Sequence, residues 1–262
     1  MPAPDLYRVR AKRGQPGWKN TAVSSDPGAP RSCAAQDCHS CEVRPLSLCG
    51  ALEESELSRL DSITRRHHTP AGATLVREGT PITFAYNITE GAVRLSRLLQ
   101  DGRRQVMGFL FTGDFIGLTR RNSFTFSAEA ITATDSCSFA LDDLEKLSDD
   151  NPHLRQRLYE MACGELDAAQ EQMLLLGRKT AQERVASFLL DVRQRQLRHD
   201  SDESCITLPM TRGDIADYLG LTLETVSRSF SRLRQEQIIE VRETYRVALL
   251  DFTRLQALSG SS

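Results

Sequence analysis

Four of the seven cysteines lie within one short stretch near the N-terminus, CAAQDCHSCEVRPLSLC, which runs from Cys33 to Cys49. Cysteine thiolates bind zinc and iron–sulfur clusters, and a CxxC spacing brings two sulfurs to adjacent positions on a metal centre. The N-terminus has no apolar run of signal-peptide length, so we expect a cytoplasmic protein. In that reducing compartment, clustered thiols serve metal binding or redox chemistry more often than permanent disulfides. The stretch therefore predicts a metal or redox site.

A second group of candidate functional residues lies near the C-terminus, in LPMTRGDIADYLGLTLETVSRSFSRLRQ. Thr211 and Asp214 are placed to cap a short helix, a glycine permits a tight turn, and Thr222 caps the next helix. This is helix-turn-helix spacing. The following IIEVRETYRVALLD alternates as two short strands around Glu243-Thr244, which predicts a wing.

The exposed side chains of the second helix favour DNA recognition over a purely structural hairpin. Glu224, Ser227 and Arg228 are spaced i, i+3 and i+4, so they leave one face near the helix N-terminus. Arginine can bind guanine O6 and N7, a carboxylate can accept from cytosine N4, and a hydroxyl can contact base or phosphate. Arg232 and Arg234 are candidates for phosphate contacts. The alternative for Glu224 and Arg228 is an ordinary surface salt bridge.

Composition limits the function classes. The chain has 262 residues, and its 33 basic and 35 acidic side chains give a formal net charge of −2. This charge argues against a surface that binds nucleic acid or membrane everywhere, so any DNA contact must be local. No run of about 18 apolar residues occurs, so no membrane association is expected.

The elements that must position these residues fall into an α+β organisation. Glycine-punctuated runs rich in Val, Ile, Phe and Thr, from about Thr69 to Ala140, predict an antiparallel β-roll, preceded by an amphipathic helix over 52–63. The basic side chains near the start of the chain could touch nucleic acid or form a solvated tail. The expected parts are a flexible basic tail (1–32), a cysteine segment (33–50), a β-roll sensor domain (51–150), a long dimerisation helix (151–178) and a winged helix-turn-helix domain (179–262).

One apolar stripe runs along the predicted long helix, with steps of four, four, three, four and three residues. A narrow stripe on a helix of about seven turns suits a seam between two helices, so we expect a homodimer. Packing of the stripe against its own domain is the alternative. The stripe consists of Leu158, Ala162, Leu166, Ala169, Met173 and Leu176.

Together these features resemble the CRP/FNR superfamily of bacterial transcription regulators, and within it the FNR group of oxygen-responsive regulators. The resemblance extends from Cys33 to about Ser259. It is carried by the cysteine-rich N-terminus, the β-roll, GELDAAQEQMLLL followed by RKTAQERVASFL, and LPMTRGDIADYLGLTLETVSR.

The resemblance implies an oxygen-labile 4Fe-4S cluster held by three N-terminal cysteines and one distant cysteine. In this sequence these are Cys38, Cys41, Cys49 and Cys137, with Cys33 as a spare. The C-x7-C gap is longer than in the best-known member, a change that a loop tolerates at small entropic cost.

The resemblance also implies a mechanism without enzymatic activity. An intact cluster favours the dimer, which binds palindromic TTGAT-like sites in double-stranded DNA and contacts RNA polymerase to activate or repress transcription. Oxygen releases the cluster and lowers DNA affinity.

Two departures from the family bear on function. Relatives that bind cyclic nucleotide use an arginine where this chain has Phe126, in FTFSAEAI. Without that cation an anionic ligand would be buried unpaired, so no cyclic nucleotide is expected unless Arg120 or Arg121 turns inward. At the position of Ala169, relatives carry an acidic residue whose repulsion helps keep the cluster-free form monomeric, so the switch here is expected to be leakier or tuned elsewhere.

Two alternatives remain open from the residues alone. Four local cysteines suffice for a structural zinc site, in which case Cys137 is dispensable and oxygen is irrelevant. A redox enzyme or electron carrier using CxxC is the other class, but no Rossmann glycine pattern, P-loop or catalytic constellation supports it.

Overall fold

The structure, a computed structural model, describes residues 37–119, 121–198, 204–243 and 245–260. All of these lie in the unit Arg31–Ser262. The expected tail over 1–32, Cys33, Arg120 and Thr244 lie outside the described residues.

The cysteine segment folds into two short 3-10 helices, η2 (Arg44–Leu46) and η3 (Leu48–Ala51), before helix α1 (Glu54–Ile63). A capping box between Glu53 and Glu56 starts α1. The expected apolar face of this helix is confirmed, because Leu57 and Leu60 are fully buried.

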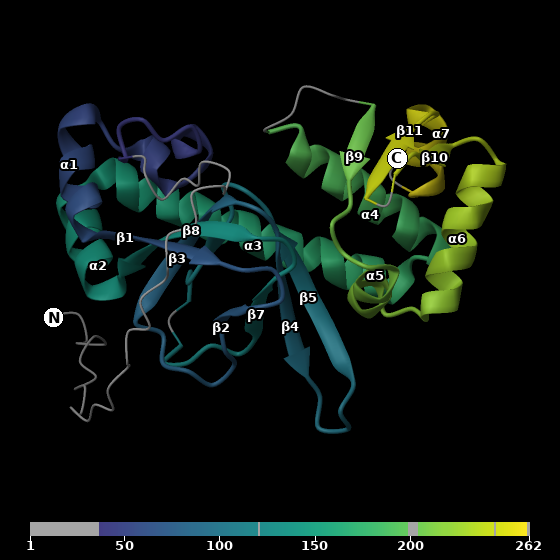
Figure 1. The fold of residues 1–262 in the computed structure, drawn as a ribbon, viewed down its shortest axis with the longest axis horizontal. Helices are drawn as coiled ribbons and strands as arrows, with labels where there is room; N and C mark the ends of the chain where they lie inside the picture. Colours follow the sequence, from purple (N-terminus) through teal and green to yellow (C-terminus); the bar gives the residue numbers. More distant parts are fainter. Residues whose placement is uncertain (1–36, 120, 199–203, 244, 261–262) are drawn as a thin grey trace, which may run out of the picture. The chain divides into compact units, whose positions relative to one another are not determined.

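The predicted β-roll is confirmed as two four-stranded antiparallel sheets (Figure 1). An apolar core that includes Ile88, Val93 and Ile116 belongs to strands of both sheets. The first sheet has the order β1 (Thr64–Thr69), β8 (Thr134–Ala140), β3 (Phe84–Glu90) and β6 (Phe115–Ile116). The second has the order β2 (Thr74–Val76), β7 (Ser127–Ala130), β4 (Val93–Leu98) and β5 (Arg104–Leu110).

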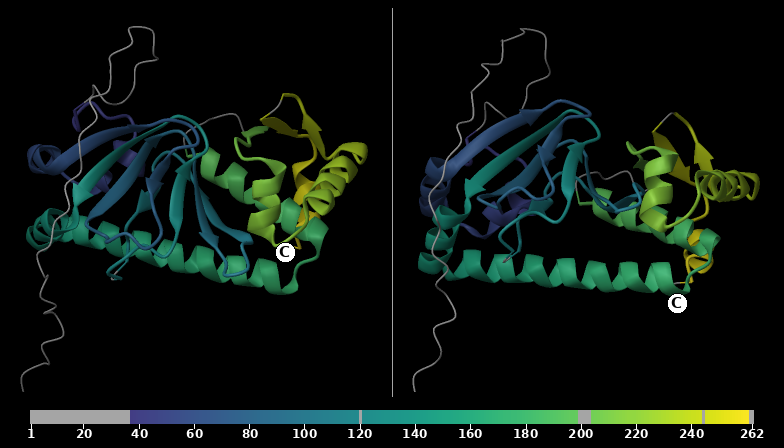
Figure 2. Two further views of the ribbon diagram at one scale, coloured as in Figure 1. Left: turned by 60° about the horizontal axis from the view of Figure 1, so that its bottom comes forward. Right: turned by 90° about the horizontal axis from the view of Figure 1, so that it is seen from below.

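The long helix α3 (Pro152–Arg178) follows α2 (Leu141–Asp150) and runs beside the roll as far as the C-terminal domain (Figure 2). Asn151 caps it, since its side-chain oxygen accepts from the Leu154 N–H at 2.9 Å. Leu154 near one end and Leu175 near the other are buried. The chain therefore anchors α3 at its two ends.

The C-terminal domain has the expected winged helix-turn-helix order. The predicted cap formed by Thr211 and Asp214 is present, and a further capping box joins Thr180 and Glu183 at the start of the preceding helix. Gly220 has a φ of 62°, the left-handed conformation needed in the turn. The elements are α4 (Ala181–Gln196), β9 (Cys205–Thr207), α5 (Arg212–Leu219), α6 (Leu223–Gln235), β10 (Ile239–Val241), β11 (Arg246–Leu249) and α7 (Phe252–Leu258), with strand order β10-β11-β9.

A charged cluster connects the roll to the helix-turn-helix. Asp214, whose side chain is 3% exposed, accepts from Arg94 on β4 at 2.5 Å and from Arg104 on β5 at 2.7 Å. Arg104 also pairs with Asp217 at 2.7 Å, and Arg94 pairs with Glu129. The carboxylate that caps α5 thus also holds this helix to the second sheet of the roll.

None of the helices in the described part of the chain is both long and apolar enough to span a bilayer.

We predict that Asp214→Ala destabilises the protein by about 1 to 3 kcal/mol, because two arginines and the α5 cap lose their common acceptor. Asp217→Ala is the matched control. Its side chain is 33% exposed and it serves Arg104 alone, so a loss below about 1 kcal/mol is expected. Urea unfolding measures both; equal losses would contradict the assigned role of Asp214.

Candidate metal centre and nucleic-acid interface

The register of the first sheet sets the position of Cys137. On β8 it lies directly opposite Arg66 of β1 and Asn87 of β3. Directly opposite residues of antiparallel strands project from the same face of the sheet. Two positions further along, Phe139 and Ala85 share this face and belong to the core that contains Cys38. The thiol of Cys137 therefore lies on the face that is covered by the cysteine segment.

The structure brings the four predicted ligands into one region. Cys38 is buried in this core, and Cys49 and Cys137 pack against it. Cys49 is near enough to Cys38 to act on it electrostatically, and Cys41 acts on Cys49 in the same way. No disulfide joins any of the cysteines that the structure describes.

Burial keeps two of these thiols protonated. It raises the pKa of Cys38 to about 12, with a hydrogen bond to Asp61 adding to the effect. It likewise raises the pKa of Cys49 to about 11. Metals bind the thiolate, so binding at this site must release protons.

A set of four cysteine thiolates can ligate either an iron–sulfur cluster or one zinc ion. Thiolates alone are the usual ligands of 4Fe-4S clusters. Among the described residues, no three His, Cys, Asp or Glu side chains lie close enough to share one metal ion. Asn87, on the same face as Cys137, is 2% exposed, and its Oδ1 has no hydrogen-bond partner in the described structure. A buried polar atom in this state is expected where a further group binds.

The other two described cysteines lie elsewhere. Cys163 is half-buried in the middle of α3, and Cys205 is buried at the start of β9. Neither belongs to the core around Cys38. Their positions suit small, partly or fully buried apolar side chains and not ligands of this site.

The cysteine segment packs directly on the first half of α3. Leu48 directly precedes Cys49 and Leu52 follows it by three residues. Both share a core with Leu154 of α3. Arg157 of α3 donates to the carbonyl of Leu46 at 3.4 Å. The arrangement of the segment is therefore coupled by contact to the start of the long helix.

The residues at the two ends of the predicted dimerisation stripe differ in burial from those in its middle. Leu158 and Leu176 pack against cores of their own chain, which was the alternative for the whole stripe. Leu166 and Met173 are 58% and 66% exposed. Ala162 and Ala169 are exposed as well. Leu166 and Met173 thus give the middle of α3 an apolar surface that the described part of the chain does not cover, whereas Ala169 also borders a cavity between α3 and β5.

Helix α6 presents the predicted recognition face. Thr222 caps it, accepting from the Thr225 N–H at 3.2 Å. Glu224, Ser227 and Arg228 are all exposed, whereas the opposite face of the helix is buried. The pKa of Glu224 is lowered, first by its own backbone N–H, then by the Thr222 hydroxyl and by the charge of Arg228. Glu224 is therefore ionised near neutral pH, ready to accept from a base.

Arg232 is engaged within the protein. It pairs with Glu236 at 2.8 Å, and Glu236 also pairs with Arg254 of α7 at 3.3 Å. A phosphate contact by Arg232 would have to share or replace this pair. Arg234 is exposed on the same helix. The sequence did not indicate the role of Glu236, because Arg254 is 18 residues away in the chain.

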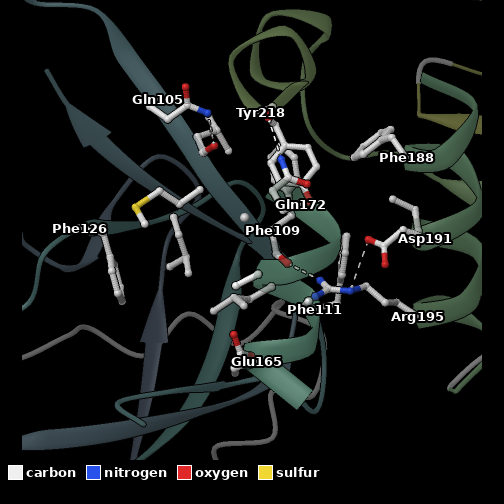
Figure 3. Close-up of a pocket in the computed structure, with 18 of the residues that line it drawn as sticks. Gln105, Phe109, Phe111, Phe126, Glu165, Gln172, Phe188, Asp191, Arg195 and Tyr218 are labelled. Carbon is white, nitrogen blue, oxygen red and sulfur yellow. Dashed lines mark hydrogen bonds and ion pairs between the residues drawn. The ribbon is translucent and has the colours of Figure 1, made fainter. Parts of the chain in front are cut away.

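A cavity of about 450 Å³ lies among β5, α3, α4 and α5 (Figure 3). Aromatic side chains, Phe109, Phe188 and Tyr218, form much of its lining. Its one arginine, Arg195, donates to the Phe109 carbonyl at 2.6 Å and lies 3.6 Å from Asp191. Every cation among the described residues that line the cavity is therefore already paired, and none is free to bind an anionic ligand.

Comparison with known proteins agrees with this architecture. The Crp-like helix-turn-helix domain matches residues 183–258, and the Cyclic nucleotide-binding domain matches residues 66–151. The nitrogen fixation regulation protein FixK of Bradyrhizobium diazoefficiens is 41% identical, over 86% of this chain and 94% of that protein. The transcriptional activator protein FnrL of Cereibacter sphaeroides is 38% identical, over 85% of this chain and 92% of that protein.

Among solved structures, FixK2 from Bradyrhizobium japonicum matches with a TM-score of 0.71 and 38% identity, over 76% of this chain and 99% of that one. The relatives are named as regulators and activators of transcription, and the helix-turn-helix that they share with this chain is a DNA-binding element. The chain therefore belongs to the CRP/FNR family of transcription regulators.

Proposed function

We propose that this regulator responds to oxygen through a 4Fe-4S cluster held by Cys38, Cys41, Cys49 and Cys137. The observation that carries the proposal is the position of Cys137. Although 88 or more residues separate it from the other three in the sequence, it faces the core in which Cys38 is buried. When bound, such a cluster would supply an oxygen-labile link between the cysteine segment and the roll.

The chain's own contacts suggest how the state of the link reaches the dimer interface. The segment that carries three of the thiols packs on α3 through Leu48 and Leu52. Holding this segment against the sheet favours one placement of the first turns of α3. The exposed middle of α3 can then pair with a second chain. A preference of a few kcal/mol suffices to shift the population between monomer and dimer.

The dimer presents two copies of α6 to DNA. Twofold symmetry requires a palindromic site with half-sites about one helical turn apart. By family resemblance the half-site is TTGAT-like, with Glu224, Ser227 and Arg228 contacting bases. Contact with RNA polymerase, and activation or repression of promoters, follow from the same resemblance; FnrL is itself named a transcriptional activator.

No cyclic nucleotide is part of the proposal. Phe126 is half-buried and packs on Phe124 with ring centroids 5.8 Å apart, so an aromatic ring stands where the phosphate-binding arginine is expected. Arg121 is exposed. Neither Phe126 nor the exposed Arg121 therefore offers an anionic ligand inside the roll the cation that would compensate for its burial, as far as the described residues go.

Metal analysis of anaerobically purified protein tests the proposal against structural zinc. Iron and sulfide in equal amounts, with visible absorbance that fades in air, support the cluster. Colourless protein with one zinc per chain would contradict it.

Replacing Cys137 tests the distant ligand. We expect Cys137→Ala to lose nearly all bound iron, since the other three thiols lie on one segment. Cys163→Ala is the control, because this half-buried cysteine on α3 is outside the site, and it should keep wild-type iron content. Retention of iron by Cys137→Ala would remove Cys137 from the ligand set.

Base recognition is tested with Arg228→Ala, which should cost about 1 to 3 kcal/mol at one base pair of the half-site and little at others. Arg234→Ala, further along the same helix, should weaken binding to all sequences alike and reduce the salt dependence. Binding titrations on sites with single base-pair changes distinguish the two. A uniform loss for Arg228→Ala would make it a phosphate contact.

The dimer interface is tested by a pair of adjacent residues. Neighbouring residues on a helix diverge by about 100°, so Met173 lies on the stripe and Leu174 off it. Both are exposed, at 66% and 51%. Sedimentation of anaerobic protein should show Met173→Glu as a monomer and Leu174→Glu as a dimer, because only the first places a charge in the apolar seam. Equal effects would mean that the stripe is not the interface.

A further inference from the structure

Two polar side chains flank Cys137 in a single row across three strands. Arg66 of β1 and Asn87 of β3 are its direct partners on either side, so all three project toward the cysteine segment. Neither Arg66 nor Asn87 is a usual metal ligand. Their position beside a candidate ligand requires an explanation of its own.

Arg66 reaches from this row to the buried cysteine. Its Nη2 lies 3.9 Å from Cys38 Sγ and 2.6 Å from Asp61 Oδ1. Its charge also acts on Cys137. Asp61 lies beside the Cys38 thiol as well, within hydrogen-bonding reach. Once Cys38 is a thiolate it can no longer donate, and the Arg66 guanidinium is then the adjacent cation for both sulfurs.

Asn87 presents the unsatisfied amide atom. Its side chain is almost fully buried, yet Oδ1 has no hydrogen-bond partner within the described structure. Burial of a polar atom without a hydrogen-bond partner destabilises a fold. The oxygen and nitrogen of an asparagine amide are nearly equivalent in shape, so a half-turn places NH₂ where Oδ1 lies. The NH₂ group is a donor, so a thiolate or sulfide could accept its hydrogen bond, whereas an apolar neighbour could not.

Hydrogen bonds to the sulfurs and the surrounding charge are two of the features by which a protein adjusts an iron–sulfur cluster. We propose that Arg66 and Asn87 are positioning residues that stabilise the thiolate-bound cluster, Arg66 by its charge and Asn87 by a hydrogen bond to sulfur. This inference rests on the proposed function. It adds two residues that hold no iron and yet determine how readily iron is lost.

The test uses full-length Arg66→Gln and Asn87→Leu, purified without oxygen. Iron and sulfide content should match wild type, while anaerobic transfer of iron to an excess of an iron(II) chelator should be about tenfold faster, as expected for the loss of one charge-assisted interaction. Arg65→Gln is the matched control, because Arg65 is the adjacent residue on β1, is exposed and lies over Phe84. It should transfer iron at the wild-type rate.

The metal-free proteins separate this role from a structural one. Asn87→Leu removes an unpaired polar atom from a core, so its metal-free form should unfold at the same or a higher urea concentration than wild type. Lower stability together with an unchanged chelation rate would overturn the proposal. Complete loss of iron from either variant would also overturn it, since the residue would then hold the cluster. Wild-type protein without iron would refute the proposed function instead.

Discussion

The pairing of β1, β8 and β3 is the constraint on which the candidate site depends. Cys137 faces the cysteine segment only because its strand lies between the other two in this register. A slip of one residue on β8 would turn Cys137 into the roll and bring Ser136 or Ser138 to the outer face. The antiparallel pairing thus brings Cys137, from the last strand of the roll, to the sheet face covered by the cysteines that precede the roll in the sequence.

From this face, contacts lead in two directions along the molecule. The cysteine segment and the start of α3 share one apolar core, so the placement of the segment and of the helix are linked. At the other end of the roll, Asp214 is held by arginines from β4 and β5 while it caps α5. The second sheet, which shares an apolar core with the sheet that carries the candidate site, is therefore bonded directly to the helix-turn-helix, in addition to the connection through α3 and α4.

Local patterns in the sequence predicted the elements well. The caps at Thr211 and Thr222, the left-handed turn at Gly220 and the recognition face of α6 depend on residues within four positions of each other, so spacing alone was informative. The long helix was predicted for the same reason. Its stripe is predicted to form the dimer seam, with packing against its own domain as the alternative, and the structure packs both ends of the stripe within the chain.

The residues that sequence reasoning missed are those whose partners are distant. A period of two shows that alternate residues of a strand share a face, but it does not reveal which residue of another strand lies opposite, so Arg66 and Asn87 could not be placed beside Cys137. Asp214 was recognised as a helix cap, yet Arg94 lies 120 residues away. Resemblance to a family supplied Cys137 as a candidate ligand; nothing in its local sequence did.

We propose that the integrity of a cluster at this sheet face governs the pairing of two chains. The most direct measurement follows visible absorbance, dimer fraction and affinity for a palindromic site in one anaerobic sample as air is admitted. We expect absorbance, dimer fraction and DNA affinity to decline with a single time course. Full promoter affinity and an unchanged dimer fraction after the absorbance has gone would contradict it.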